Sequence, residues 1–356
     1  MLQQETSMLA RLRWLPVTAG LAMTLGCAGP VEQPVEQPAA PQGADVVHLT
    51  YDWPIGLIAR AHYRLDKERE GNGGDFAYAV KGHYRIETER SSQGLQVNFS
   101  EVELGVDDGG ASPEGVEGYV RRLAAQAAAI SPGYVVSDAG ELVAVTDVAD
   151  LRAALLQELE AFAADQPADV RQRIGEMLDR LLSEEQLVAR IQGEWNRDVG
   201  QWLDARLERG YVYETEFDSV LPLAGNATVP TKAQYRYLGR VPCSDRDTGT
   251  RCVKLDMQSF IDPDGFRPAM ERFFEQLGRR MPEDMDVRMD YTVTVVTEPD
   301  TLIPHEVRWS KVTVASLGEG GSDTRRAERG HIAYTYLRGA AVNGGAKGRS
   351  ARRRER

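Results

Sequence analysis

The sequence contains no run of about 20 apolar residues, so a protein that crosses a membrane repeatedly through helices is excluded. Phosphate-binding glycine loops, dinucleotide fingerprints, serine elbows and paired-histidine zinc helices are also missing. Only five residues are histidine, and His62 and His83, on one polar face beside arginines, make a poor cation site. The sequence therefore gives no ground for predicting an enzyme, and we expect no cofactor and no metal.

Positive charge is scarce in most of the chain. The formal net charge is −12, although the last ten residues carry six basic side chains against one glutamate. Because nucleic-acid binding requires lysine and arginine to replace phosphate counterions, so acidic a body predicts no nucleic-acid partner. We interpret residues 339–356 as a disordered, solvated basic tail, with adhesion to an anionic surface as the alternative.

The amino end has the order of features of an export signal. Arg11 and Arg13 precede a mostly apolar stretch, residues 14–26, that is too short to span a bilayer as a helix. This stretch ends in Thr-Leu-Gly immediately before Cys27. It resembles the signal of bacterial lipoprotein precursors, in which glycine or alanine precedes the lipid-modified cysteine, although leucine is usual where this chain has threonine.

The resemblance implies a signal peptide over residues 1–26 (Met8 is an alternative start), cleavage before Cys27 and lipid attachment to that cysteine. A plain signal peptide that is cleaved nearby is the alternative. Residues 27–44 contain Val-Glu-Gln-Pro twice and predict a disordered tether. Ala28 after the cysteine is similar to lipoproteins sorted to the outer membrane, so the expected location is the periplasmic side of that membrane, held by lipid on Cys27.

Cys243 and Cys252 are the two remaining cysteines, and eight residues separate them between two strand-like segments. In an oxidising compartment such a pair predicts a disulfide that closes a hairpin loop. A two-thiol metal site is the alternative, but two ligands are too few and no histidine lies close in the sequence. Residues 247–250, Asp-Thr-Gly-Thr, copy an aspartic-protease motif only once, whereas that chemistry needs two carboxylates, so we predict an ordinary loop.

The body, residues 45–338, alternates between strand-like and helical patterns. Period-two alternation predicts two strand-rich lobes, over residues 45–146 (with a helix at 113–130) and 209–338, and helical spacing predicts a block over 147–208 between them. Nearly all links between strands are short, which favours antiparallel pairing. We therefore predict an α+β fold with antiparallel β-sheets in two lobes and a central helical block.

Charge selects the register of the first hairpin. One register that keeps the apolar face intact places Arg60 opposite Arg85, and the other places Arg60 opposite Glu87 and Asp66 opposite Lys81. Opposite charges that face each other stabilise a strand pair by about 0.2–1 kcal/mol, and like charges destabilise it. We therefore predict the second register.

Three further local features are predicted. A phase slip within residues 99–102 indicates a β-bulge. Ser183 followed by Gln186 three residues later is typical of the start of a helix. Trp195 and Trp202 lie two turns apart on one stripe of that helix, which favours the core, with stacking on a ligand as the alternative.

Three functional hypotheses follow. The first is a lipid-anchored, non-catalytic module that binds an envelope protein or serves the envelope structurally. The second is a carrier of an apolar ligand or lipid, because long antiparallel strands with helices over one face weakly resemble the half-barrels of lipoprotein-carrier families. The third is a hydrolase. A continuous apolar cavity of several hundred Å³ between sheet and helices would favour the carrier, and a filled interior would favour the module.

Overall fold

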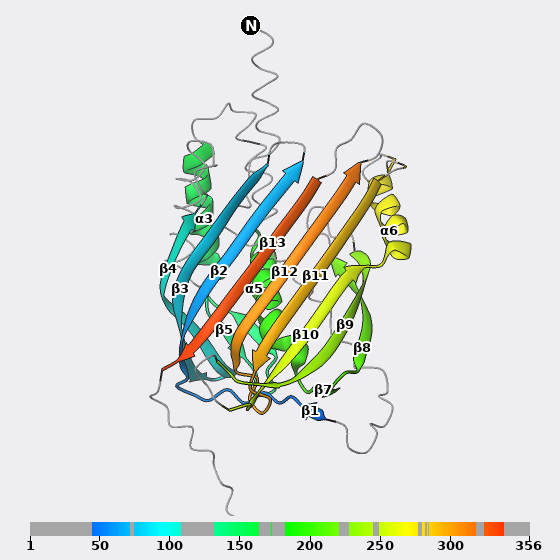
Figure 1. The fold of residues 1–356 in the computed structure, drawn as a ribbon. Coiled ribbons are helices and arrows are strands. Elements are labelled where there is room, and N and C mark those ends of the chain that lie inside the picture. The colour runs from blue at the N-terminus through cyan, green and yellow to red at the C-terminus, as the bar shows by residue number, and fades with distance from the viewer. Residues whose placement is uncertain are drawn as a thin grey trace, which may run out of the picture.

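The computed structural model describes residues 45–71, 75–107, 132–163, 172, 182–220, 228–244, 249–276, 280, 281, 283, 285–317 and 324–337. The expected signal peptide, tether and basic tail lie outside this part of the chain, as does the helix expected over residues 113–130. Figure 1 shows one large curved sheet, with α5 lying on the side toward which the edges of the sheet bend.

Most of the described chain belongs to an antiparallel sheet of eleven strands, in the order β6-β5-β4-β3-β2-β13-β12-β11-β10-β9-β8. Its strands are β2 (Ile58–Gly71), β3 (Phe76–Ser91), β4 (Gly94–Asp107), β5 (Tyr134–Val136), β6 (Leu142–Val145), β8 (Val212–Val220), β9 (Thr228–Val241), β10 (Cys252–Ile261), β11 (Met285–Thr297), β12 (Pro304–Leu317) and β13 (Thr324–Tyr336). Strands that follow each other in the sequence pair as neighbours, except that β2 pairs with β13.

A small second sheet and a few helices complete the described chain. β1 (Val46–His48) pairs with β7 (Arg206–Glu208) in a two-stranded sheet. The helices are α3 (Val148–Ala163), α5 (Glu184–Asp198), the short 3-10 helix η1 (Gly200–Trp202) and α6 (Pro263–Gln276). Within the described residues, none of the helices has the length and apolar character needed to cross a membrane.

The predicted fold class was wrong. The described chain is mostly β, and its strands do not divide into two lobes with a helical block between them. Strands from both predicted lobes form a single sheet, because Tyr63 of β2 pairs with Ile332 of β13 at its centre. Local alternation predicts strands but does not say which distant strands pair, and the β2–β13 pairing decides the architecture.

The predicted register of the first hairpin was also wrong. The like-charged pairs that face each other are Arg60 with Arg85 and Arg64 with Lys81. The apolar inner face is intact in this register, and it would be equally intact in the predicted one. The hairpin therefore accepts two pairs of facing cations in place of the attractive pairs that the sequence predicted.

Carboxylates on the same strand and on β4 neutralise these cations. Arg64 donates to Asp66 of its own strand at 2.7 and 2.8 Å. On the other side, Lys81 donates to Asp107 of β4 at 3.0 Å. Glu101 of β4 lies 3.4 Å from Arg60. A prediction from two strands alone could not include β4, whose carboxylates supply counter-charges to the facing cations.

Other local predictions were confirmed. The register between β3 and β4 shifts where His83 faces Glu103 and Arg85 faces Ser100, and Glu101 has a φ of 50°, so the bulge lies within the predicted residues. Ser183 caps α5 by accepting a hydrogen bond from the Gln186 amide at 3.2 Å.

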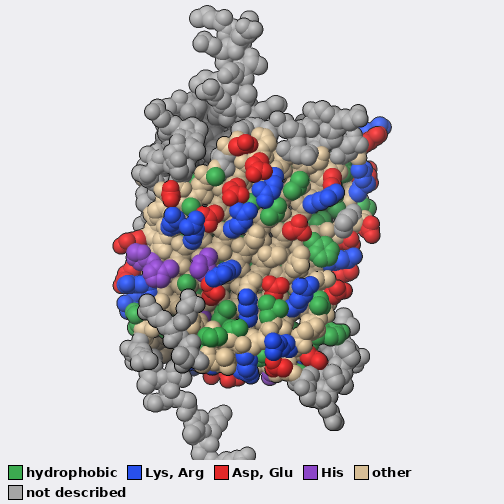
Figure 2. All heavy atoms as spheres, in the orientation of Figure 1, with side chains coloured by type: hydrophobic (Ala, Val, Ile, Leu, Met, Phe, Trp, Pro, Cys, Tyr) green, Lys and Arg blue, Asp and Glu red, His purple; other side chains and the backbone are tan. Residues whose placement is uncertain are grey.

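The two faces of the large sheet differ in chemistry. In β2, Ala59, Ala61 and Leu65 are buried on the inner face, while Arg60 and His62 point outward. Figure 2 shows the outer face, where basic and acidic side chains are interspersed over the central strands. The inner face carries the main apolar core and faces α5. An apolar molecule would therefore find its favourable surroundings only on the inner side.

Candidate functional site

A partly open cavity of about 290 Å³ lies between the inner face of the sheet and α5. Its walls come from β2, β3, β4, β12 and β13 on one side and from α5 on the other, with further residues from the segments around β1 and β5. Most lining side chains are aliphatic or aromatic. The volume lies near the lower end of the range for small-molecule sites, about 300–1,000 Å³.

Aromatic rings in mutual contact form one wall of the cavity. The Trp195 ring lies 5.4 Å from Trp53 and 5.4 Å from Tyr134, in both cases with ring planes steeply inclined. Phe99 extends the cluster, 5.6 Å from Tyr134. The Trp195 Nε1 donates to the Gly140 carbonyl at 3.0 Å, which fixes the indole. Edge-to-face contacts of this kind add stability beyond burial, so this wall is rigid.

A buried ion pair lies at the C-terminal end of α5, and both of its side chains line the cavity. Arg197 Nε donates to Asp198 Oδ1 at 2.6 Å, and Nη2 donates to Oδ2 at 3.2 Å. The guanidinium also lies 3.9 Å from the ring centroid of Trp309 on β12. Tyr334 of β13 donates its hydroxyl to Asp198 at 3.3 Å. These contacts hold α5 against β12 and β13 and satisfy both charges.

Glu194, one turn before Asp198, is different because its carboxyl faces the cavity. The residue is exposed to water-sized molecules through the cavity, which is itself partly open to solvent. No hydrogen bond or ion pair to this carboxyl occurs among the described residues. Burial raises its pKa above the usual 4.5, Arg197 and Arg190 oppose that rise, and Asp198 and Glu328 add to it. The cavity therefore holds one titratable carboxyl that a bound molecule can meet.

Tyrosine hydroxyls supply most of the other polar atoms. Burial raises the pKa of four lining tyrosines, and the negative charge of Glu194, of Asp198 or of both raises it further. These tyrosines are Tyr63, Tyr84, Tyr134 and Tyr334. They remain neutral at physiological pH and offer hydrogen bonds from rings that are otherwise apolar. Lys67, which also lines the cavity, forms a second ion pair with Glu328 at 3.2 Å.

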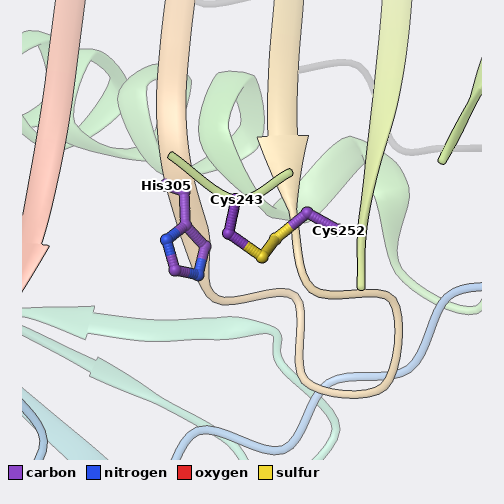
Figure 3. Close-up of side chains that lie close together, drawn as sticks. All are labelled: Cys243, Cys252 and His305. Carbon is purple, nitrogen blue, oxygen red and sulfur yellow. A yellow bond between two sulfur atoms is a disulfide. The ribbon is translucent and has the colours of Figure 1, made fainter. Parts of the chain in front are cut away.

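The predicted disulfide is confirmed, and the two tryptophans are buried. Cys243 and Cys252 are bonded, with Cα atoms 5.0 Å apart (Figure 3). Trp202 lies wholly in the core, in η1 beyond the end of α5. Trp195 is buried and also lines the cavity, so the structural role and the ligand-facing role coincide in one residue. Cys27, the predicted lipidation site, lies outside the described residues.

The weaker candidates from the sequence stay apart from the cavity. His62 and His83 face each other directly on the outer face of the sheet, with ring centroids 6.3 Å apart. Of the Asp-Thr-Gly-Thr segment, residues 247 and 248 lie outside the described residues.

Sequence reasoning missed the charged groups of the cavity. Arg190, Glu194 and Arg197 recur at helical spacing beside the tryptophan stripe of α5. A charged stripe is usually the solvated face of a helix, so the sequence favoured the opposite placement. The available signal was the adjacent stripe that contains Trp195. A helix that buries this stripe also brings the neighbouring charged residues close to the core.

Comparisons with known proteins leave the family open. No protein-family model matches the sequence, and no curated protein is significantly similar to it. Among solved structures, a lipovitellin chain, from a structure described as lipid–protein interactions in lipovitellin, is 10% identical with a TM-score of 0.37; the match covers 82% of this chain and 26% of lipovitellin. The Pseudomonas aeruginosa protein OccK2 (OpdF) is 8% identical with a TM-score of 0.13, over 82% of this chain and 98% of that one. This chain spans about a quarter of the lipovitellin chain, and neither TM-score reaches 0.5.

Proposed function

We propose that this chain is a non-catalytic binding protein that carries an apolar, lipid-like molecule in the cavity between α5 and the sheet. The observation that carries the proposal is the cavity itself, about 290 Å³ with mostly apolar and aromatic walls. A module that acts only through its surface would be expected to fill this space with side chains, because protein interiors are closely packed.

The distribution of polarity supports the same conclusion. The outer face of the sheet carries interspersed basic and acidic side chains, as Figure 2 shows, and several of them form ion pairs, so an apolar molecule has no continuous surface to adhere to there. Inside, the Arg197–Asp198 and Lys67–Glu328 pairs are internally neutralised. The cavity thus offers apolar walls with a few oriented polar groups, the usual composition of a small-molecule site.

The experiment is a titration with N-phenyl-1-naphthylamine, a neutral probe whose fluorescence rises in apolar surroundings. We expect saturable binding of one probe per chain. Ala59→Phe is the test variant, because Ala59 is buried in β2 and lines the cavity, so the added ring occupies the space. Ala77→Phe on the exposed face of β3 is the matched control. We expect the first variant to lose at least about tenfold in affinity and the second to bind as the parent does.

Circular dichroism and the thermal midpoint establish that each variant is folded. Should Ala59→Phe fail to fold, Val102→Phe fills the same cavity from the half-buried edge of β4. Equal binding by the parent and by a folded, cavity-filled variant would refute the proposal. Absence of saturable binding to the parent would refute it as well.

We further propose that the carrier is anchored to a membrane by lipid on Cys27, as its resemblance to lipoprotein precursors implies. An anchor and a Pro-containing tether would hold the cavity near a source of apolar ligands. Intact-mass spectrometry of the natively expressed protein tests this, with acyl mass at Cys27 expected and release of the Cys27→Ser variant into the soluble fraction. An unmodified amino terminus upstream of Cys27 would remove the anchor from the proposal and leave the cavity untouched.

A further inference from the structure

Three metal-ligating side chains meet where β9 and β11 end and β10 and β12 begin. This cluster borders the cavity, because the His305 ring lies 5.0 Å from that of Tyr336, which lines it. Cys243 follows β9, Cys252 begins β10, and His305 belongs to β12, two strands away. Figure 3 shows the imidazole directed toward the two sulfur atoms. One ligand atom from each side chain lies within 4.8 Å of the other two, and all three residues are buried. The histidine is more than 50 positions from either cysteine in the sequence, so spacing gave no sign of it.

From this cluster we infer that reduction of the Cys243–Cys252 disulfide creates a binding site for a zinc ion, with His305 as the third ligand. Two thiolates and an imidazole are the donor set that Zn²⁺ prefers in proteins. In the oxidised chain the sulfurs are bonded to each other and cannot act as thiolates. The bridge is thus one of two states of the site, and the other state holds a metal.

The strands around the two cysteines allow zinc to replace the disulfide bond with only local movement. Tetrahedral zinc, with Zn–S distances of about 2.3 Å, places two sulfurs about 3.8 Å apart. The Cα atoms of the pair are 5.0 Å apart, so rotation about the side-chain bonds and a small shift of the Cys243 loop suffice. Cys252 and His305 are fixed by the strands of the central sheet and need not move.

Glu298 orients the histidine. Its Oε1 lies 3.1 Å from His305 Nε2, and its other oxygen accepts a hydrogen bond from the Thr301 hydroxyl at 3.3 Å. Arg251 lies 3.8 Å from the same carboxylate. Carboxylates that hydrogen-bond one ring nitrogen of a histidine in this way commonly support metal binding at the other nitrogen, and water can fill the fourth position.

Charge also favours zinc over a harder ion. Two thiolates and a neutral imidazole cancel the charge of Zn²⁺, so the loaded site is neutral and avoids the cost of a buried unpaired charge. Magnesium and calcium prefer oxygen ligands, of which this cluster has one carboxylate at its edge. The site therefore discriminates by donor type.

The redox step balances with a dithiol as the reductant. The disulfide takes up two electrons and two protons, its S–S bond breaks, and two thiols form, while the dithiol is oxidised to its own disulfide. Zinc then displaces the two thiol protons as it binds, and these protons pass to the solvent. No other co-reactant is required.

The test uses the full chain with Cys27→Ser, so that the pair supplies the only thiols. The protein is treated under argon with a phosphine reductant in chelator-free buffer, and alkylation followed by mass measurement counts the free thiols. Co²⁺ is then added as a spectroscopic probe. We expect one cobalt per chain, with the visible bands of a tetrahedral thiolate site, in the reduced protein and none in the oxidised protein. Zn²⁺ should displace the cobalt stoichiometrically.

Two histidine variants separate this site from adventitious binding. His305→Ala should weaken metal affinity at least about 10–100-fold, whereas His331→Ala should change nothing. His331 is a matched control because it also pairs with a glutamate, Glu306 at 2.8 Å, but belongs to β13 and is not part of the cysteine cluster. Equal affinity in both variants, equal binding by the oxidised chain, or a bridge that stays closed in the reductant would each overturn the inference. None of these outcomes bears on ligand binding in the cavity.

Discussion

Gly330 of β13 lies directly opposite Trp309 of β12, and the indole ring occupies the space that a side chain at position 330 would need. A Cβ atom at this glycine would lie 1.9–2.3 Å from three ring atoms of the indole. The same indole supports the guanidinium of Arg197 and lines the cavity. The absence of one side chain on β13 thus sets the position of a ring that shapes the candidate site.

Gly330→Ala should therefore displace the indole and destabilise the protein. Overpacking of this kind costs about 1–3 kcal/mol, and we expect a lower urea midpoint together with weaker binding of the naphthylamine probe. Gly105→Ala on β4 is the control, because the nearest atom to its Cβ is 3.8 Å away. That variant should be neutral or stabilising by about 0.4–1 kcal/mol. Similar losses in both variants would show that the indole contact is unimportant.

Removal of one partner from the Arg197–Asp198 pair should be more harmful than removal of both. Arg197→Met leaves a buried carboxylate without its main partner, and we expect a loss of about 3–5 kcal/mol in the free energy of unfolding. Adding Asp198→Asn should restore a substantial part of that loss, because no isolated charge is then buried. Equilibrium denaturation of the two variants measures the difference. Additive effects would mean that the pair does not act as a unit.

Glu194 should make stability fall as pH rises. Its folded-state pKa lies above the usual 4.5, so between that value and the folded pKa the native state binds more protons than the unfolded state. The free energy of unfolding then decreases with pH across this window and levels off above the folded pKa. Glu194→Gln should remove this component, so the variant gains on the parent as pH rises through the window.

Urea midpoints of parent and Glu194→Gln, measured from about pH 4 to pH 8, test this dependence. Glu275→Gln, on the exposed surface of α6, controls for the loss of a carboxylate as such and should track the parent. A constant difference between the parent and Glu194→Gln across the whole range would show that burial does not shift this carboxyl.

Loss of the disulfide should cost measurable stability in the absence of metal. The bridge joins residues nine positions apart, and the chain-entropy relation gives about 2–3 kcal/mol for a loop of this length. Cys243→Ser with Cys252→Ser, compared with the parent in chelator-containing buffer, should show that loss in the urea midpoint. An unchanged midpoint would mean that the loop is held by other contacts.

Strand positions were predictable because the sheet has one polar and one apolar face. Alternation in β2 and β3 placed the right residues inward, and the phase slip near Glu101 indicated the bulge. Register was not predictable from the hairpin alone, because Asp107 and Glu101 of the third strand decide where Lys81 and Arg60 find their counter-charges.

The candidate site was less predictable than the strands. Its walls combine β2 with β13, whose pairing no local pattern reports, and its charged groups lie on a helix stripe that ordinarily faces water. The same limit applies to His305, which approaches Cys252 only because β10 and β12 flank β11. In each case the sequence did not indicate which distant segments lie together, although it did indicate the chemistry of the individual residues.

The pairing of β2 with β13 also fixes when the pocket can come into being. During synthesis, β3 to β6 and β8 to β12 can pair as hairpins soon after they emerge. The second neighbour of β2 is β13, which is synthesised more than 250 residues later. Until then two long edges stand open to foreign strands. A nascent chain halted before residue 324 would contain the strands on both sides of β13. It would still lack the β2–β13 pairing that completes the walls of the ligand cavity.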